Sequence, residues 1–218
     1  MSQNAISNKQ CTLLLFLILW LTSRAPYWIA YMAEWPTYAE MISAVLSMSL
    51  AIILPLIADA KWYKYASFDK TVLPSTNKQY FLIPPAVVLI ITWSSLVGFV
   101  LHRLGYTRTI VVSMSATLVA VNWAIVIVLA PLAEEIFWRG YALDQFSKTM
   151  NKPAACLLCA IIFTLSHLPT LGVYSIAVLG VGVVLGYYRI RYRALLPMVL
   201  SHILANGIVV LAALTSNL

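Results

Sequence analysis

Charged residues are scarce in this chain. Only 10% of its 218 residues are charged and only seven are acidic, whereas a soluble domain carries about 25% charged residues. So few charges cannot cover the surface of a water-soluble globule, and the long apolar blocks exclude a disordered chain. With 62% hydrophobic residues and a mean hydropathy of +0.89, the sequence predicts an all-α, polytopic transmembrane helix bundle in a cell membrane.

Cysteine is equally rare, and no cleavable leader is evident. Cys11, Cys156 and Cys159 all lie in apolar stretches, which argues against an extracellular disulfide framework. Cys156 and Cys159 have the spacing of a redox motif, but inside a lipid-buried helix we interpret them as packing residues. No small-residue cleavage site follows the first apolar run, so we expect that run to remain as a helix.

The excess of basic residues does not indicate nucleic-acid binding. The net charge is +7, but lysine and arginine lie in short segments between the apolar blocks, as in loops that flank membrane spans. We therefore expect the partners to be the lipid bilayer and a membrane-associated peptide or protein substrate, and no nucleic acid.

The apolar blocks predict about seven spans, since a spanning helix needs about 20 mostly apolar residues. They lie near residues 11–31, 41–60, 81–101, 110–133, 153–169, 171–188 and 195–214. Arg24 and Pro26 interrupt the first block, which leaves open whether its span ends at Ser23 or continues to residue 31. In the sixth block, the small residues Gly182 and Gly186 predict the close approach of a neighbouring helix.

Basic residues divide unevenly between the two sides of such a bundle. One side would carry Lys9, Lys61, Lys64, Lys70, Lys78, Lys148, Lys152, Arg189, Arg191 and Arg193. The other side would carry only Arg24, Arg103 and Arg108. Because cytoplasmic loops are enriched in lysine and arginine, we expect the N-terminus in the cytoplasm and the C-terminus outside.

Polar residues in and beside the last four blocks form the candidate site. A charge at the centre of a membrane helix costs about 2.5–3.5 kcal/mol, so such residues usually face a cavity or a partner and have a function. The candidate residues are Glu134, Glu135, Arg139, His167, His202 and Asn206.

Helical spacing predicts how these residues face one another. Glu135 and Arg139 are four residues apart and share a helix face, where they can pair, while Glu134 is turned away from that pair. Glu134 and His167 are almost equally far from the loop centred near Met150. In an antiparallel helical hairpin the two therefore lie at nearly the same depth. His202 and Asn206 also share a face.

The chemistry that such a cluster permits is the activation of water. A desolvated carboxylate can act as a general base near neutral pH, and an imidazole can hold the same water or give a proton to the leaving amine. A second imidazole and an amide NH₂ can stabilise a developing oxyanion. Two structural interpretations stay open. Glu135 and Arg139 can form an ion pair that stabilises the fold, and Asn206 can be a residue that forms hydrogen bonds between helices.

At these residues the sequence resembles the CPBP family (CAAX proteases and bacteriocin-processing proteins) of intramembrane proteases, which includes the type II CAAX prenyl endopeptidases. The family pattern is E-E-x-x-x-R, then F-x-x-x-H, then H-x-x-x-N/D on successive helices. This chain reads Glu134-Glu135-Ile136-Phe137-Trp138-Arg139, then Phe163-Thr164-Leu165-Ser166-His167, then His202-Ile203-Leu204-Ala205-Asn206. The resemblance covers roughly residues 110–214.

The resemblance implies a glutamate-type intramembrane endopeptidase whose last four helices form a conical core around the buried polar site. It assigns water activation to Glu134 and His167, support of the site to Glu135 and Arg139, and oxyanion stabilisation to His202 and Asn206. The expected organisation is residues 1–109 as N-terminal spans with a basic cytoplasmic loop and residues 110–218 as the catalytic core. A prenylated C-terminal peptide, a bacteriocin or pheromone leader and a C-terminal sorting tail would all suit such an enzyme as substrate.

A zinc mechanism is the alternative to a metal-free one. Glu134, His167 and His202 could bind zinc together with a water, but the zinc-protease signature H-E-x-x-H is absent from the sequence. We therefore expect no cofactor and favour a metal-independent glutamate mechanism.

Other functions predict other features. A proton-coupled transporter also uses buried glutamate and histidine, but it predicts internal repeats with paired helix breaks, which the sequence does not show. A non-catalytic immunity or scaffold factor would have no need for all six polar residues. A serine mechanism through Ser166 or Ser201, or a cysteine mechanism through Cys159, would leave both glutamates unexplained.

Overall fold

The computed structural model describes residues 3–61, 76–106 and 115–215, which form helices and no strand. The elements are α1 (Gln3–Met32), α2 (Thr37–Lys61), η1 (Asn77–Leu82), α4 (Ile83–Arg103), α5 (Ala116–Ala124), η2 (Ile125–Leu129), α6 (Ala130–Glu134), η3 (Glu135–Ala142), α7 (Leu143–Thr149), α8 (Lys152–Leu165), α9 (Leu168–Leu171), η4 (Gly172–Ser175), α10 (Ile176–Tyr192) and α11 (Leu196–Thr215). The predicted all-α fold is confirmed. Most of the basic loop expected near residues 61–79 lies outside the described residues, as does Arg108.

Within the described part of the chain, six helical segments are long and apolar enough to cross a membrane, and α8 is a shorter apolar helix. The predicted fifth span, 153–169, was therefore too long, because α8 ends at Leu165. The chain then turns at His167 and starts the one-turn helix α9, with Pro169 in its first turn. Proline has no N–H to continue the preceding helix and favours the start of a new one.

The first span does not end at Ser23, because α1 continues without a break from Gln3 to Met32 and contains Pro26. A proline is tolerated in a membrane helix where neighbouring groups satisfy the freed backbone. Arg24 also fits inside the helix because its side chain has a partner in the bundle, the carboxylate of Glu134.

One unbroken helix runs from α5 to α7, and the predicted end of the fourth span at residue 133 was wrong. Glu134, Glu135 and Arg139 are buried and paired, so the helix continues through them. Two π-helical stretches, η2 and η3, interrupt its α-helical geometry. In these stretches Ala130 N–H bonds the carbonyl of Ile125 and Leu143 N–H bonds that of Trp138. Single π-turns of this kind are frequent at functional sites.

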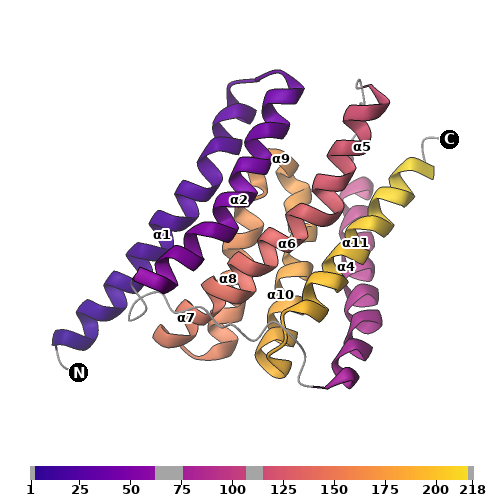
Figure 1. Ribbon diagram of the computed structural model, residues 1–218. Helices are drawn as coiled ribbons and strands as arrows, with labels where there is room; N and C mark the ends of the chain where they lie inside the picture. The colour runs from indigo at the N-terminus through magenta and orange to yellow at the C-terminus, as the bar shows by residue number, and fades with distance from the viewer. Residues whose placement is uncertain (1–2, 62–75, 107–114, 216–218) are drawn as a thin grey trace.

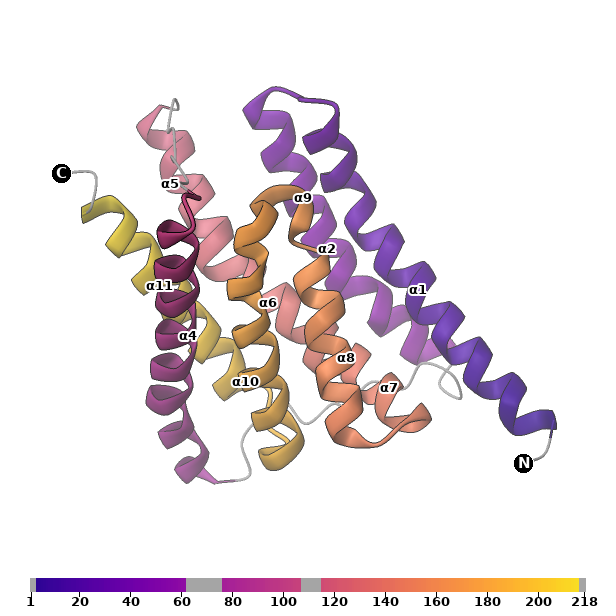
Figure 2. The ribbon, with the colours of Figure 1, turned by 180° about the vertical axis from the view of Figure 1, so that it is seen from behind.

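The long helix crosses the middle of the bundle (Figure 1). The α1–α2 hairpin flanks it on one side and α4 with α11 on the other, while α8 and α10 pack against each other across one face (Figure 2). The two termini lie at opposite ends of the bundle. Elements from both halves of the sequence therefore surround the long helix.

The contact between α8 and α10 depends on two glycines, as the small-residue spacing predicted. A Cβ atom on Gly182 would lie 2.7 Å from the Cβ of Ala160, and one on Gly186 would lie 2.7 Å from the sulfur of Cys156. Both distances are too short for a real side chain. Cys156 and Cys159 are free and buried in this contact, in agreement with their interpretation as packing residues.

Candidate active site

Glu134 ends α6 and faces a cavity in the bundle. Its Oε1 lies 3.5 Å from Nε2 of His167, which follows α8. The antiparallel arrangement expected from their distances to Met150 thus brings the two residues together. His167 Nδ1 bonds the carbonyl oxygen of Phe163 at 2.8 Å. Because a carbonyl only accepts hydrogen bonds, Nδ1 carries the proton and Nε2 is the nitrogen available to exchange protons with Glu134 or a water.

Arg24 is the second partner of Glu134 and was not among the predicted site residues. Its Nη2 lies 3.4 Å from Glu134 Oε1, and its side chain is only 12% exposed. Arg24 was instead counted as a loop charge, which was wrong because it lies inside α1. The signal was present in the sequence: a charge inside an apolar block requires a partner, for arginine as for glutamate.

Glu135 points away from the cavity and into the protein. Its side chain is 0% exposed, and its Oε1 accepts hydrogen bonds from Arg139 Nη1 at 2.7 Å and from His202 Nδ1 at 2.9 Å. Arg139 also donates to the carbonyl of Val181 at 3.1 Å, and its guanidinium lies over the ring of Phe163. This buried network fixes the ring of His202, whose other nitrogen is left for the cavity that His202 lines.

Asn206 follows His202 by one turn of α11 and also lines the cavity. Its Nδ2 donates to the carbonyl of Val126 at 2.9 Å. An amide NH₂ carries two hydrogens, so this contact uses one of them. The structure therefore places all six predicted residues around one point, with Glu134, His167, His202 and Asn206 at the cavity and Glu135 and Arg139 behind it.

The cavity has a volume of about 540 Å³, which is in the range of about 300–1,000 Å³ typical of ligand sites. Its walls come from α1, α2, the long helix, α8 to α11 and the turn at His167. Polar side chains are spread along them: Arg24, Tyr27, Tyr31, Thr37, Glu40, Ser47, Asn122, Glu134, Ser166, His167, Thr170, His202 and Asn206.

The geometry gives the alternative nucleophiles and the zinc site little support. Ser166 and Ser201 donate their hydroxyl hydrogens to the backbone carbonyls of Phe163 and Pro197, and Cys159 does not line the cavity. Within the described ranges, no three His, Cys, Asp or Glu side chains are grouped so that they could hold a metal ion. His202 Nδ1 is bonded to Glu135, so only its Nε2 would be left for a metal.

Comparison with known families gives one match. Residues 116–208 match the family model of the type II CAAX prenyl endopeptidase Rce1-like proteins. The matched region runs from α5 into α11 and contains the six predicted site residues, whereas Arg24 lies outside it. No curated protein and no solved structure matches the chain.

Proposed function

We propose that this protein is an intramembrane endopeptidase of the glutamate type, like the type II CAAX prenyl endopeptidase Rce1-like proteins whose family model residues 116–208 match, and that Glu134 is its base. The substrate of the proposed reaction is a membrane-associated peptide or protein. The observation that supports the assignment is the carboxylate of Glu134 facing Nε2 of His167 at 3.5 Å across a cavity inside the bundle.

In the proposed reaction a water held between Glu134 and His167 attacks the carbonyl carbon of the scissile bond. Its proton passes to the carboxylate of Glu134, and a tetrahedral oxyanion forms. The C–N bond then breaks, and the leaving amine takes the proton from Glu134, directly or through Nε2 of His167.

His202 and Asn206 lie on the wall of the same cavity and are the proposed donors to the oxyanion. His202 Nδ1 already donates to Glu135, so Nε2 can donate only when the ring is an imidazolium. The carboxylate oxygen of Glu135 lies 2.9 Å from that Nδ1. Asn206 would contribute the second hydrogen of its Nδ2. Preorganised donors of this kind contribute about 10²–10³-fold to kcat in other hydrolases.

Glu135 and Arg139 act as positioning residues in this proposal, because neither lines the cavity. Arg24 Nη2 lies 3.4 Å from Oε1 of Glu134, the same oxygen that faces His167. The transporter alternative has less support, because both π-helical breaks lie in the single helix from α5 to α7 rather than in corresponding helices of two halves.

The test compares membranes of cells that produce the wild-type protein or Glu134→Gln, and identifies new peptide termini by mass spectrometry. Glutamine keeps the volume and removes the base, so cleavage should fall by about 10²–10⁴-fold with unchanged thermal unfolding in detergent. Asp144→Asn is the matched control, since this acid on the same long helix pairs with Lys148 at the surface, away from the cavity. Wild-type cleavage by Glu134→Gln would remove Glu134 as the base.

A further inference from the structure

We infer that the cavity opens to the non-cytoplasmic side of the membrane, so that the substrate is a segment of a membrane-anchored polypeptide exposed on that side. The substrate part of this inference rests on the proposed function. The direction in which the cavity opens, called the access part below, follows from three features of the bundle. These are the position of the cavity's open end, the residues that close its other end, and the distribution of charge between the two ends.

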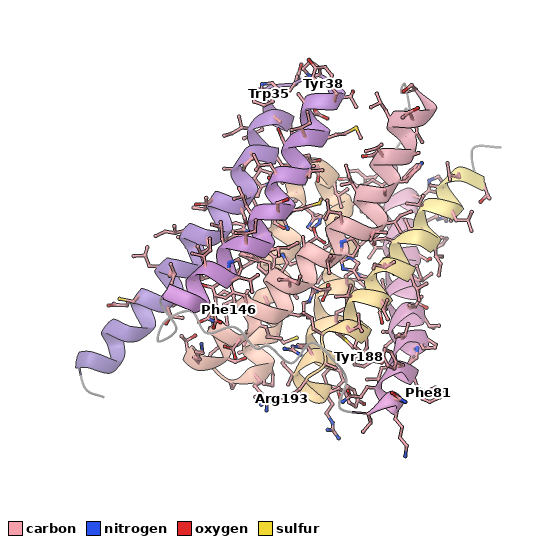
Figure 3. All side chains as sticks on the ribbon, viewed as in Figure 1. Trp35, Tyr38, Phe81, Phe146, Tyr188 and Arg193 are labelled. Atoms are coloured by element: carbon pink, nitrogen blue, oxygen red, sulfur yellow. The ribbon has the colours of Figure 1, made fainter. Side chains whose placement is uncertain are left out.

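The end of the cavity that lies farthest from Glu134 is formed at the connection between α1 and α2. Tyr31 in the last turn of α1, Thr37 and Glu40 in the first turn of α2, and Leu171 at the end of α9 all line it. These segments lie at the end of the bundle that Trp35 and Tyr38 mark, opposite to Phe81 and Arg193 (Figure 3). From Glu134 the cavity therefore extends toward that end.

The other end is closed by an aromatic layer. Phe137, Trp138, Tyr141 and Phe146 follow Glu134 along the long helix, and Phe16 of α1 packs against them, with its ring centroid 4.7 Å from that of Phe146. Each of the five side chains is at most 4% exposed, and none lines the cavity. Among the described residues, the cavity does not extend past this layer.

Charge differs between the two ends. At the closed end, the part of the chain that the structure describes carries six basic residues, which are Lys78, Lys148, Lys152, Arg189, Arg191 and Arg193. The open end carries the acids Glu34 and Glu40 and, in the last turn of α4, Arg103. The positive-inside rule counts lysine and arginine near span ends and places the richer side in the cytoplasm. The open end then faces outward.

Water can reach Glu134 by the same route. Ser47, Asn122 and Thr170 also line the cavity, and such groups are costly against lipid because nothing there accepts or donates hydrogen bonds. The wall is shared by α2 and α5, whose outer surfaces are apolar, with Ile42 66% and Val121 46% exposed. A polypeptide anchored beside these helices could enter between them.

Thiol labelling in intact cells tests the access part without any substrate. The background variant is Cys11→Ser, which leaves only the buried Cys156 and Cys159. Thr37→Cys at the mouth, Thr170→Cys on the wall and Ala154→Cys at the exposed start of α8 are treated with a membrane-impermeant maleimide. We expect labelling at the first two positions in intact cells and at Ala154→Cys only after permeabilisation. Labelling of Ala154→Cys from outside, or protection of Thr37→Cys or Thr170→Cys in intact cells, would overturn the inference.

The positions of new peptide termini test the substrate part. Termini that depend on Glu134 should fall on the non-cytoplasmic side of the substrates' membrane anchors. Glu134-dependent termini on the cytoplasmic side would overturn this inference and leave the proposed function standing. A lack of Glu134-dependent cleavage, including in detergent where both sides are accessible, would contradict the proposed function, while the labelling result would still decide the direction of the opening.

Discussion

The side-chain amide of Asn206 on α11 donates a 2.9 Å hydrogen bond to the backbone carbonyl of Val126 in η2. In an α-helix this carbonyl would bond the N–H of Ala130, which here bonds Ile125 instead. The next residue, Pro131, has no N–H to give. The first π stretch thus leaves a backbone acceptor that a neighbouring helix satisfies.

In the second π stretch, too, a side chain from a neighbouring helix bonds a backbone carbonyl. Leu143 N–H bonds the carbonyl of Trp138, and Nε of Arg189 on α10 donates to the carbonyl of Arg139 at 3.3 Å. Glu134 lies between the two stretches, at the end of α6. Side chains from α11 and α10 therefore hold the backbone on both sides of the proposed base.

Asn206→Ala should lower stability as well as activity. An unpaired buried carbonyl costs about 1–3 kcal/mol, and the Val126 carbonyl would lose its donor. The control is Ser201→Ala on the same helix, whose hydroxyl bonds only the carbonyl one turn back and should matter little. Thermal unfolding in detergent measures both. Equal unfolding temperatures for the two variants would show that the Asn206–Val126 bond does not stabilise the long helix.

Arg139→Ala should be more destabilising. It removes the 2.7 Å partner of the fully buried Glu135, and breaking a buried ion pair costs about 3–5 kcal/mol. His202 would also lose its fixed orientation, so activity should fall with stability. Lys148→Ala, which breaks a surface pair with Asp144, should change stability by at most about 1 kcal/mol. A stable but inactive Arg139→Ala protein would assign Arg139 to the reaction rather than to the fold.

The sequence was sufficient to predict the class of fold and the clustering of the six polar residues, because each carries a strong physical signal, while the roles of the six residues stay a prediction. Apolar blocks of spanning length have few alternatives, and a charge in such a block needs a partner. The depth argument for Glu134 and His167 used only the regular rise of a helix.

The continuation of the long helix past residue 133 could not be predicted by the same reasoning. The hydropathy pattern treats Glu135 and Arg139 as the end of a span, whereas they are buried against His202 and the carbonyl of Val181, which are distant in sequence. The π stretches depend on Asn206 and Arg189 in the same way. Arg24 was missed because its partner lies 110 residues away, and no local pattern relates the two.

Gly182→Ala should destabilise the contact between α8 and α10. The added methyl group would lie 2.7 Å from Ala160 Cβ and 2.8 Å from its Cα, and relief by helix separation would disturb the neighbouring Val181 carbonyl that Arg139 bonds. Overpacking of this kind costs about 1–3 kcal/mol. Gly98→Ala is the matched control, because nothing lies within 4 Å of its added Cβ and alanine favours a helix by about 0.5–1 kcal/mol. The two variants should shift the unfolding temperature in opposite directions, and a gain in stability from Gly182→Ala would contradict the tight contact.

Arg24→Gln tests whether α1, outside the region of the family match, contributes to the site. Hydrogen bonds to charged groups contribute about 1.5–3 kcal/mol, so kcat/KM should fall by about 10- to 100-fold, given that each 1.4 kcal/mol is about tenfold. The unfolding temperature should change little, because the carboxylate of Glu134 still contacts His167 and still faces the cavity. Arg24→Lys retains the charge without the planar guanidinium group, so its kcat/KM should be intermediate. The control Arg103→Gln, at the end of α4 and away from the cavity, should have the kcat/KM of the wild type. Wild-type kinetics for Arg24→Gln would exclude Arg24 from the proposed site, and loss of folding would make its pair with Glu134 a structural one. The expected order of activity, wild type above lysine above glutamine at equal unfolding temperature, requires that the cation acts on the carboxylate of Glu134 itself.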